Sequence, residues 1–411
     1  MNQAHTAEAG RRGSDVRSDC WVRLARTDSG GIQLDLKSKV ASMYGDSIRG
    51  LVGEMMSAFG IGNARIEIED AGALPFVLMA RVECALRRLR ANAGGSGGAA
   101  SGDGYLPDWA AGTQYGTRRD RFRRSRLYLP GNEPKFMLNA GLHGPDGVIL
   151  DLEDSVAPAV KDEARLLVRN ALRAIDFRGA ERMVRINQGE RGIADLDFIV
   201  PHNVHVVLIP KVESAQEVTR VDERVQEIIQ NASTRASAAG TSEHRVFLMP
   251  IIESALGAIK AYEIATASPN VVALTIGLED YTADIGAART PEGRESVWAR
   301  AQVVNAARAA GLQPIDTVFS DVGDTEGLRA SVLEAKGLGF EGKGCIHPRQ
   351  IQVVHEAFAP TEAELDRARQ IVAAFEAAQA KGLAAVSLGT KMIDPPVVKR
   401  AQRVLRMATG D

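Results

Sequence analysis

The chain has 411 residues, enough for a module of under about 100 residues followed by a barrel of about 250. The 50 Lys and Arg residues nearly balance the 52 Asp and Glu residues, so no overall positive field attracts nucleic acid or anionic lipid. Three widely spaced cysteines, no apolar run of membrane-spanning length and no signal-peptide core lead us to expect a cytoplasmic protein without membrane or nucleic-acid partners.

The N-terminal part of the sequence predicts a compact α+β module, which we place at residues 13–90. Short apolar or alternating runs favour strands, and two longer stretches have helical periodicity, the first of them ended by Gly60. The expected order is strand, strand, helix, strand, helix, over residues 21–24, 31–38, 40–60, 64–72 and 73–90. No cluster of catalytic side chains stands out in these residues, so we expect the chemistry in the rest of the chain.

A shift in composition marks the end of this module. Residues 91–104 read ANAGGSGGAASGDG, and such small, flexible residues behave as a random-coil tether rather than as a packed element. We therefore assign residues 91–117 to a linker and residues 118–411 to a second domain. A group carried on the module would visit the second domain at a high effective concentration set by the length of this tether.

The second domain alternates short, β-rich apolar runs with helical stretches. Near-continuous Val, Ile and Leu in a run indicates a strand buried on both faces, as in a parallel sheet covered by helices. The eight runs lie at residues 125–130, 146–154, 183–187, 204–214, 246–254, 272–280, 314–320 and 342–348. Eight such units favour a closed (β/α)8 TIM barrel. The alternative is an open doubly wound sheet, which is typically marked by a Gly-rich turn that SRLYLPGN lacks.

Acidic residues recur where these runs end, and in a parallel barrel the strand ends meet at one mouth. Oxygen ligands without nearby Cys or His favour Mg²⁺, which takes one or two protein carboxylates and keeps other positions for water and substrate. Glu253 and Asp280 follow adjacent strands and are the predicted metal ligands. Asp154 and Glu153 are expected to orient metal-bound water.

Basic side chains flank the same mouth. Arg185 ends the third run and can hold a substrate carboxylate or stabilise a developing enolate oxygen. Arg124, just before the first run, is either a substrate contact or an exposed residue of a basic segment. His347 is either a proton donor or a structural hydrogen-bonding residue. A structural alternative also stays open for the carboxylates, which could form salt bridges to Lys211 or Arg185.

From about residue 123 onward the sequence resembles the citrate lyase beta subunit family, within the wider group of citryl-, malyl- and citramalyl-CoA lyases. The resemblance rests on motifs in family order, among them RRSRLYLPG, DLEDSVAPAVKDEAR, LIPKVES, PIIESALG, GLEDYTADIG and KMIDPP. It implies Mg²⁺ on Glu253 and Asp280, with Glu253 also touching substrate, a substrate carboxylate on Arg185 and an anionic contact at Arg124. It further implies that Asp394 closes over a neighbouring subunit's site, and hence a homotrimer or a hexamer.

Residues 13–90 resemble the acyl carrier subunit of citrate lyase, through SDCWVRL, GIQLDLKSKV and YGDSIR. That family bears a phosphoribosyl-dephospho-CoA arm on the first serine of a Ser-Ser-Asp pattern. Here the pattern reads Arg17-Ser18-Asp19, so an arginine stands at the attachment position. Ser18 could take the arm after a shift of one residue, as could Ser14 in GSD, and a carrier without an arm is the remaining alternative.

The resemblance implies a retro-Claisen cleavage of a citryl-thioester to oxaloacetate and an acetyl-thioester. Asp394 or a metal-bound water oriented by Asp154 would move the proton, and a citrate lyase alpha subunit would load citrate onto the arm. Two alternatives stay open: a citramalyl-CoA or malyl-CoA lyase with a vestigial carrier domain, and a non-catalytic scaffold. CIHP stands where close beta-subunit relatives often carry Asn-Pro, and this feature is shared with the CoA-dependent lyases.

Overall fold

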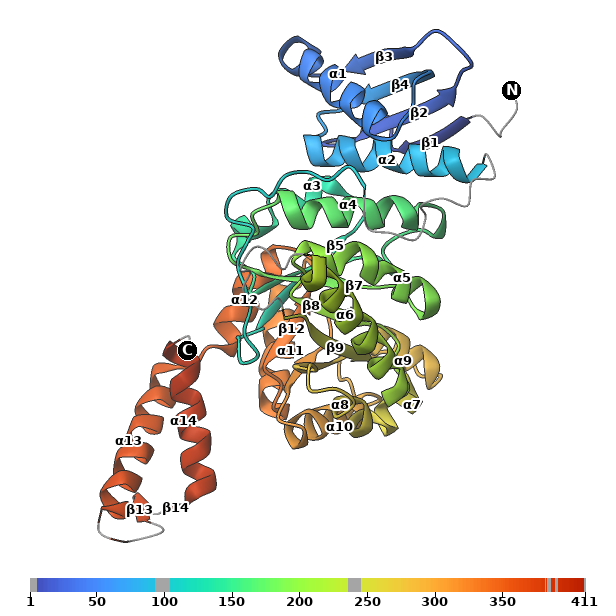
Figure 1. Ribbon diagram of the computed structural model, residues 1–411. Coiled ribbons are helices and arrows are strands. Elements are labelled where there is room, and N and C mark those ends of the chain that lie inside the picture. The colour runs from blue at the N-terminus through green and yellow to red at the C-terminus, as the bar shows by residue number, and fades with distance from the viewer. Residues whose placement is uncertain are drawn as a thin grey trace.

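The computed structural model describes residues 6–92, 104–235, 245–380, 382, 386–388 and 391–409. Figure 1 shows three bodies: an N-terminal module of strands and two helices, a central barrel, and a helical hairpin near the C-terminus that projects away from the barrel. The predicted order of a small α+β module followed by a (β/α)8 barrel is confirmed.

The N-terminal module is a mixed sheet of four strands with two helices. Its elements are β1 (Thr6–Gly10), β2 (Cys20–Arg26), β3 (Ile32–Ser38), α1 (Ala41–Ala58), β4 (Ala64–Asp70) and α2 (Pro75–Asn92), with the strands in the order β1-β2-β4-β3. Because β1 pairs with β2 along its whole length, the predicted start at residue 13 is too late. The sequence TAEAG gives little sign of this strand, since its buried residues are small alanines.

Eight parallel strands close into the central barrel. They are β5 (Ser125–Pro130), β6 (Gly147–Asp151), β7 (Glu181–Arg185), β8 (Val206–Ile209), β9 (Phe247–Ile252), β10 (Ala273–Ile276), β11 (Gln313–Asp316) and β12 (Gly342–Cys345). Each overlaps one of the eight predicted runs, and β12 pairs with β5 to complete the ring. Every residue of β6, β8 and β9 is buried, because side chains fill the barrel inside and helices cover it outside.

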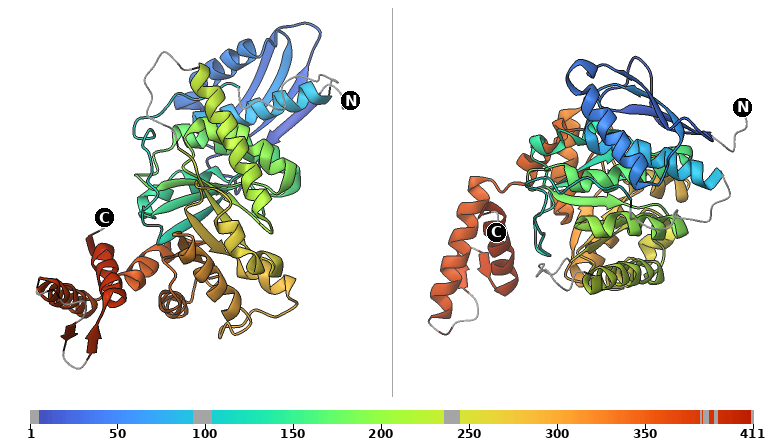
Figure 2. Two further views of the ribbon diagram at one scale, coloured as in Figure 1. Left: turned by 60° about the horizontal axis from the view of Figure 1, so that its bottom comes forward. Right: turned by 45° about the horizontal axis from the view of Figure 1, so that its top comes forward.

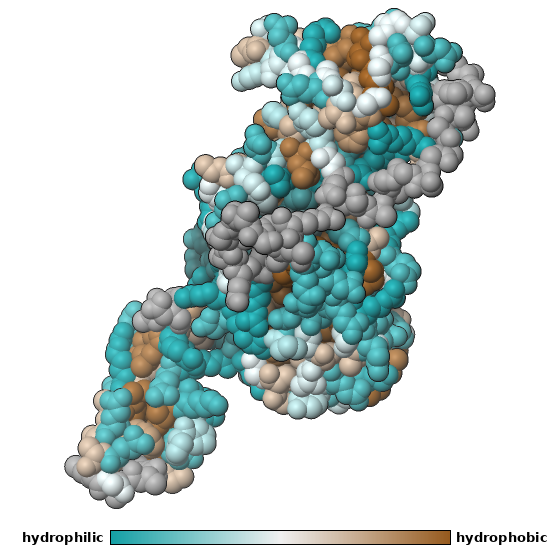
Figure 3. All heavy atoms as spheres, viewed as in Figure 1, coloured by the Kyte–Doolittle hydropathy of each residue, from teal (hydrophilic) through white to brown (hydrophobic). Residues whose placement is uncertain are grey.

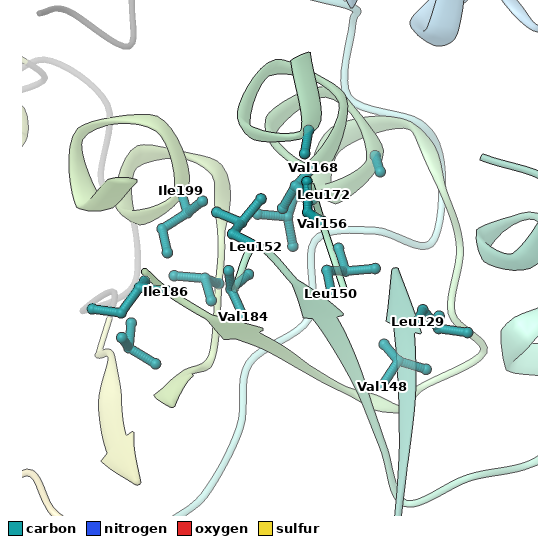
Figure 4. Packing of buried hydrophobic residues seen from close by; sticks show 14 of the residues in the cluster. Leu129, Val148, Leu150, Leu152, Val156, Val168, Leu172, Val184, Ile186 and Ile199 are labelled. Atoms are coloured by element: carbon teal, nitrogen blue, oxygen red, sulfur yellow. The ribbon is translucent and has the colours of Figure 1, made fainter. Parts of the chain in front are cut away.

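Helices cover the outside of the barrel (Figure 2). They are α3 (Pro134–Met137), α4 (Lys161–Ala174), α5 (Gly189–Ile199), α6 (Ala215–Arg235), α7 (Ala255–Ile259), α8 (Ala261–Ala265), α9 (Leu278–Asp284), α10 (Val297–Ala309), α11 (Thr325–Leu338) and α12 (Arg349–Phe358), with 3-10 turns η2 (Ala140–His143), η3 (Pro158–Val160) and η4 (Val200–His202). Figure 4 shows Leu150 and Val184 of two strands beside Val168 and Leu172 of α4. None of the described helices combines the length and apolar character needed to cross a membrane.

The module is docked on the barrel through α2, which packs along α4 (Figure 1). Arg81 of α2 bridges Asp19 of the module and Glu163 of α4, at 2.9 and 3.0 Å. Arg169 of α4 pairs with Glu83 of α2 at 2.6 Å, and all five side chains are almost fully buried. Separating the two helices would leave buried charges without partners, so this interface holds the module in place. The position of the module is therefore set by this interface and not by the length of the tether.

The predicted linker is shorter than expected. Residues 93–103 lie outside the described residues. Residues 104–117 are part of the packed structure, since Thr113 is fully buried and the Tyr115 hydroxyl donates to the Ala180 carbonyl oxygen at 2.6 Å. The run of small residues ends near residue 104, and the chain packs on the barrel from there on.

The C-terminal hairpin consists of α13 (Glu362–Gln379), β13 (Val386–Leu388), β14 (Lys391–Ile393) and α14 (Pro395–Thr409). Phe375, Ile393 and Val398 form a small core of its own. A groove of about 540 Å³ between the two helices is lined by apolar residues such as Ile371 and Met392. Figure 3 shows hydrophobic surface along this hairpin. The sequence predicted a lid here, but none of the hairpin's described residues lines the cavity at the mouth of its own barrel.

Candidate active site

A cavity of about 480 Å³ opens at the carboxyl ends of the barrel strands. Four predicted site residues, Asp154, Arg185, Glu253 and Asp280, line it together. They come from four different strand ends, so only closure of the barrel brings them to one place. The position of the cavity matches the face on which enzymes of this fold build their active sites.

Arg185 is held in place by neighbouring carboxylates. Its Nε and Nη2 each donate to a different oxygen of Asp151 at 2.7 Å, and its Nη1 lies 2.9 Å from Glu153. Burial alone would lower the pKa of Arg185, but its hydrogen bonds to Asp151 raise it above the ordinary value. The bidentate contact fixes the plane of the guanidinium. The Tyr128 ring, whose centroid lies 5.4 Å from the Arg185 Cζ, further restricts the position of the guanidinium. A permanent, oriented cation therefore faces the cavity.

Glu253 is the most strongly perturbed carboxylate of the cavity. Burial and the nearby charges of Asp280 and Glu153 raise its pKa to about 8, although its Oε1 accepts a hydrogen bond from the Lys211 backbone N–H at 2.7 Å. Gly277 explains how this carboxylate fits, because a Cβ there would stand 2.6 Å from Glu253 Oε2. The crowded negative charge makes this site attractive to a cation.

The ammonium group of Lys211 lies among three of the carboxylates at this site. Its Nζ lies 3.4 Å from Glu153, 3.5 Å from Asp154 and 3.7 Å from Asp280. Asp280 is in the first turn of α9 and its side chain is 44% exposed, so its oxygens are accessible from the cavity. The sequence named Lys211 only in the structural alternative, as a salt-bridge partner for the carboxylates, and its contact with Asp280 is of that kind. Its left-handed backbone, with φ of 50°, directs the chain sharply at the end of β8.

The carboxylates of this cavity fit the predicted metal. Among the described residues, no three acidic, histidine or cysteine side chains form a ready-made metal cage. Mg²⁺ does not need one, because it usually binds one or two carboxylates and completes its shell with water and substrate oxygens. Glu253 and Asp280 supply such a pair on one rim, with Asp154 and Glu153 beside them.

Arg124 does not reach the cavity. It precedes β5, at the amino end of the strands, and its Nε and Nη2 each bind an oxygen of Asp146 at 2.9 Å. Arg126, two residues further on, lines the cavity instead. The sequence singled out Arg124 from the motif alone, while its position before the run pointed to the other end of the barrel.

Two further predicted residues lie outside the cavity of their own chain. Asp394 directly precedes α14 in the hairpin, and its carbonyl and carboxylate oxygens accept the Val397 N–H at 3.0 and 3.2 Å. His347 does not line the cavity, and its Nδ1 accepts the Arg349 N–H at 3.1 Å. The structural role foreseen for His347 is the one observed.

The two candidate serines of the module lie in the loop between β1 and β2. Ser14 is exposed, and its hydroxyl donates to Asp15 at 3.3 Å. Ser18 is partly buried, has a left-handed backbone with φ of 57°, and its N–H binds the Ala71 carbonyl oxygen at 3.1 Å. Both therefore lie at the surface of the carrier-like fold, and Ser14 is the more accessible.

Comparison with known proteins agrees with this architecture. The protein-family model for HpcH/HpaI aldolase/citrate lyase matches residues 124–348. The protein-family model for malonate decarboxylase delta subunit (MdcD) matches residues 4–89. Citrate lyase subunit beta of Leuconostoc mesenteroides subsp. cremoris is 39% identical over 294 residues, which cover 71% of this chain and 95% of that protein. Mitochondrial citramalyl-CoA lyase of Mus musculus is 34% identical over 303 residues, covering 70% and 86%.

A solved structure has the same barrel. CitE from Mycobacterium tuberculosis, in complex with magnesium, acetoacetate and coenzyme A, matches with a TM-score of 0.56 and 30% identity, over 71% of this chain and 100% of that chain. The predictions of a carbon–carbon lyase barrel and of a carrier-like N-terminal domain are confirmed. Because the matched region covers over half of the sequence, the chain belongs to the HpcH/HpaI aldolase/citrate lyase family.

Proposed function

We propose that this protein is a Mg²⁺-dependent lyase that cleaves a citryl-thioester into oxaloacetate and an acetyl-thioester. The observation that carries the proposal is the convergence of Glu253, Asp280 and Arg185 on one cavity. Two carboxylates beside a fixed guanidinium suit a substrate that presents a hydroxyl and a carboxylate together. Similarity to citrate lyase beta subunits supports the citryl group.

The reaction breaks the bond between the hydroxyl-bearing carbon and the methylene carbon next to the thioester. A base takes the hydroxyl proton, the hydroxyl carbon becomes the keto group of oxaloacetate, and the electron pair of the broken bond forms the thioester enolate. The enolate then takes up a proton. When bound, Mg²⁺ supplies a Lewis acid at the hydroxyl and carboxylate oxygens. Arg185, oriented by Asp151, holds the carboxylate and stabilises the developing negative charge.

Proton transfer is assigned to Asp394 of a second copy, with Asp154 orienting water in the cavity. Of these two residues, Asp154 lines the cavity of its own chain and Asp394 does not. We therefore propose a homotrimer or hexamer in which the projecting hairpin of one copy closes the site of another. The apolar groove along the hairpin supports this assembly, because it gives the hairpin surface to bury.

The carrier-like module would bear the acyl group. We propose that Ser18 or Ser14 carries a phosphoribosyl-dephospho-CoA arm, loaded with citrate by a citrate lyase alpha subunit. The fold of the module and the accessible loop between β1 and β2 support this role. Because α2 is fixed on α4, the arm itself has to cover the distance to a cavity, in this chain or in a neighbouring copy.

We place the reaction in the cytoplasm. Cys20, Cys84 and Cys345 are buried and unpaired, as is usual in a reducing compartment.

A citramalyl-CoA or malyl-CoA lyase is the second candidate. The 34% identity to citramalyl-CoA lyase favours it, and the carrier-like module would then be vestigial. A non-catalytic scaffold has no comparable support.

Turnover of three substrates by the full chain tests the proposal. Citryl-CoA, citramalyl-CoA and malyl-CoA would be compared with Mg²⁺ and with EDTA. We expect citryl-CoA to be cleaved fastest and EDTA to remove the activity. Faster cleavage of citramalyl-CoA or malyl-CoA would replace the proposed substrate. Intact-mass spectrometry of the protein from its native host would test for the arm, and Ser18→Ala and Ser14→Ala would locate it.

A further inference from the structure

Arg126 is a second guanidinium of the cavity and differs from Arg185 in having no carboxylate partner. Its side chain is fully buried inside the barrel. Its Nη1 donates to Thr275 Oγ1 at 2.9 Å and lies 3.1 Å from the Met249 sulfur. Its Nε and Nη2 make no hydrogen bond to any part of the chain that the structure describes. Most of its donors are therefore available for a ligand.

Four other arginines among the described residues are as deeply buried as Arg126, and each has more of its donors satisfied. Arg81, Arg123 and Arg169 each form an ion pair of 3.0 Å or less with a buried carboxylate. Arg182 has no described carboxylate within salt-bridge distance, but both of its terminal nitrogens donate to backbone carbonyl oxygens, those of Thr113 and Tyr115. Burial lowers the pKa of Arg126, and no described carboxylate lies within salt-bridge distance to compensate. A buried cation that lacks both a counterion and partners for most of its donors is costly, and an anionic ligand in the cavity would supply both.

The neighbours of Arg126 on both adjacent strands are glycines. Its registered neighbours are Gly147 on β6 and Gly344 on β12, so neither contributes a side chain to that row of the barrel. Tyr128, two residues further along β5, lies between this row and Arg185. Arg126, Tyr128 and Gly344 all line the same cavity, which therefore extends from the mouth down to Arg126.

The depth of Arg126 matches the length of a dicarboxylate. Thr275, its hydrogen-bond partner, precedes Gly277 by two residues, and Gly277 is the residue against which Glu253 packs. Two residues of a strand span about 6.6 Å. In a four-carbon dicarboxylate three carbon–carbon bonds of about 1.5 Å join the end carbons, an extended span of about 4 Å. With one hydrogen bond of about 2.9 Å this reaches from the row of Glu253 to the row of Arg126.

We propose that Arg126 binds the distal carboxylate of the keto-acid half of the substrate and so selects the acyl group. This inference rests on the proposed function for the identity of the substrate. Cleavage of a citryl group leaves oxaloacetate, whose far end is a carboxylate. Cleavage of a citramalyl group leaves pyruvate, whose far end is a methyl group, and a malyl group leaves glyoxylate. Only the first places an anion on the buried guanidinium.

Substitution of Arg126 in the full chain tests this selection. Arg126→Met keeps an unbranched side chain beside Met249, and Arg126→Lys keeps the charge. We expect Arg126→Met to lower the ratio of kcat/KM for citryl-CoA to that for citramalyl-CoA by at least about 100-fold, because a site built for a polar group discriminates strongly. Arg126→Lys should fall between. An equal loss on both substrates, or no loss on citryl-CoA, would overturn the inference.

Thermal unfolding separates this role from a structural one. Arg126→Met removes an unpaired buried charge, so we expect its Tm to equal or exceed that of the wild type. The matched variant Arg123→Met breaks the buried pair with Glu181 and should lower the Tm. A fall in Tm for Arg126→Met as large as that for Arg123→Met would assign Arg126 to the architecture and overturn the inference.

Calorimetric binding of oxaloacetate and pyruvate, each with Mg²⁺, separates this inference from the proposed reaction. If the wild type cleaves none of the three thioesters but binds oxaloacetate more tightly than pyruvate, and Arg126→Met loses the difference, the proposed reaction fails and the anion site stands. If the wild type binds both acids equally, the inference fails even where citryl-CoA is cleaved.

Discussion

Two of the regions where this protein buries charged side chains are the interface between module and barrel and the mouth of the barrel. At the interface each charge has its partner: Arg81 contacts Asp19 and Glu163, and Arg169 contacts Glu83. At the mouth the charges are crowded and unevenly matched. Carboxylates gather around the ammonium of Lys211, Glu253 has a pKa of about 8, and Arg126 has no counterion among the described residues.

The difference shows that buried charge by itself does not mark a functional site. A set of buried charges that are all paired can be explained by its structural role. An incompletely neutralised set lowers the stability of the fold, and no interaction within the chain compensates for that loss. The second kind is expected where a cation or an anionic substrate completes the pairing. Substitutions at the mouth should therefore change activity, and substitutions at the interface should change stability.

The largest effect is expected at the metal ligands. Glu253→Gln and Asp280→Asn each remove a charged oxygen donor, so kcat/KM should fall by about 10³-fold, equivalent to about 4 kcal/mol, and Mg²⁺ binding should weaken with it. Steady-state kinetics and Mg²⁺ titration would measure both. Glu190→Gln, at a side chain that is 80% exposed on α5, serves as the control. Either ligand variant with activity within tenfold of wild type would count against the metal site.

A substitution at the interface should lower the free energy of unfolding and leave kcat/KM unchanged. Glu83→Gln leaves the buried Arg169 without its charge partner, which costs about 3 kcal/mol. Urea unfolding would measure the loss, and kcat/KM per folded molecule should stay unchanged. If the variant lost activity without losing stability, the contrast between the two regions would collapse.

Asp151 should act through Arg185. Asp151→Asn keeps the shape of the side chain but loses its charge, so Arg185 is oriented less firmly and kcat/KM should fall by about 10- to 100-fold. In an Arg185→Lys background the same substitution should have little further effect, because the bidentate contact is already gone. Additive losses in the double variant would show that Asp151 works independently of Arg185.

The smallest effect is a pH dependence at the edge of the interface. Burial alone would raise the pKa of Asp162, but its hydrogen bonds with Arg88 hold it below the ordinary value. A depressed folded pKa contributes stability above the unfolded value of about 3.9 and loses it as the pH falls through the folded value. The difference in urea midpoint between wild type and Asp162→Asn should therefore be largest near neutral pH and vanish in acid. A difference that grows in acid would contradict this pairing.

Much of the barrel and half of its site could be predicted without coordinates. Each of the eight apolar runs overlaps a strand, and Asp154, Arg185, Glu253 and Asp280 line one cavity. Both results depend on local features, the burial pattern of a strand and the position of a polar residue at its end, and the parallel barrel brings equivalent ends together. Arg126 also left a local signal, since it is a charge inside an otherwise apolar run.

By itself, the sequence determined the kind of fold and the residue types gathered at the mouth, because these follow from neighbours along the chain. Only the tertiary structure decided that β1 completes the module, that α2 is fixed on α4, that Arg126 rather than Arg124 lines the cavity, and that Asp394 lies away from it. Those outcomes depend on contacts between groups that are far apart in the sequence. Glu83 and Arg169 are 86 positions apart, and no local pattern relates them.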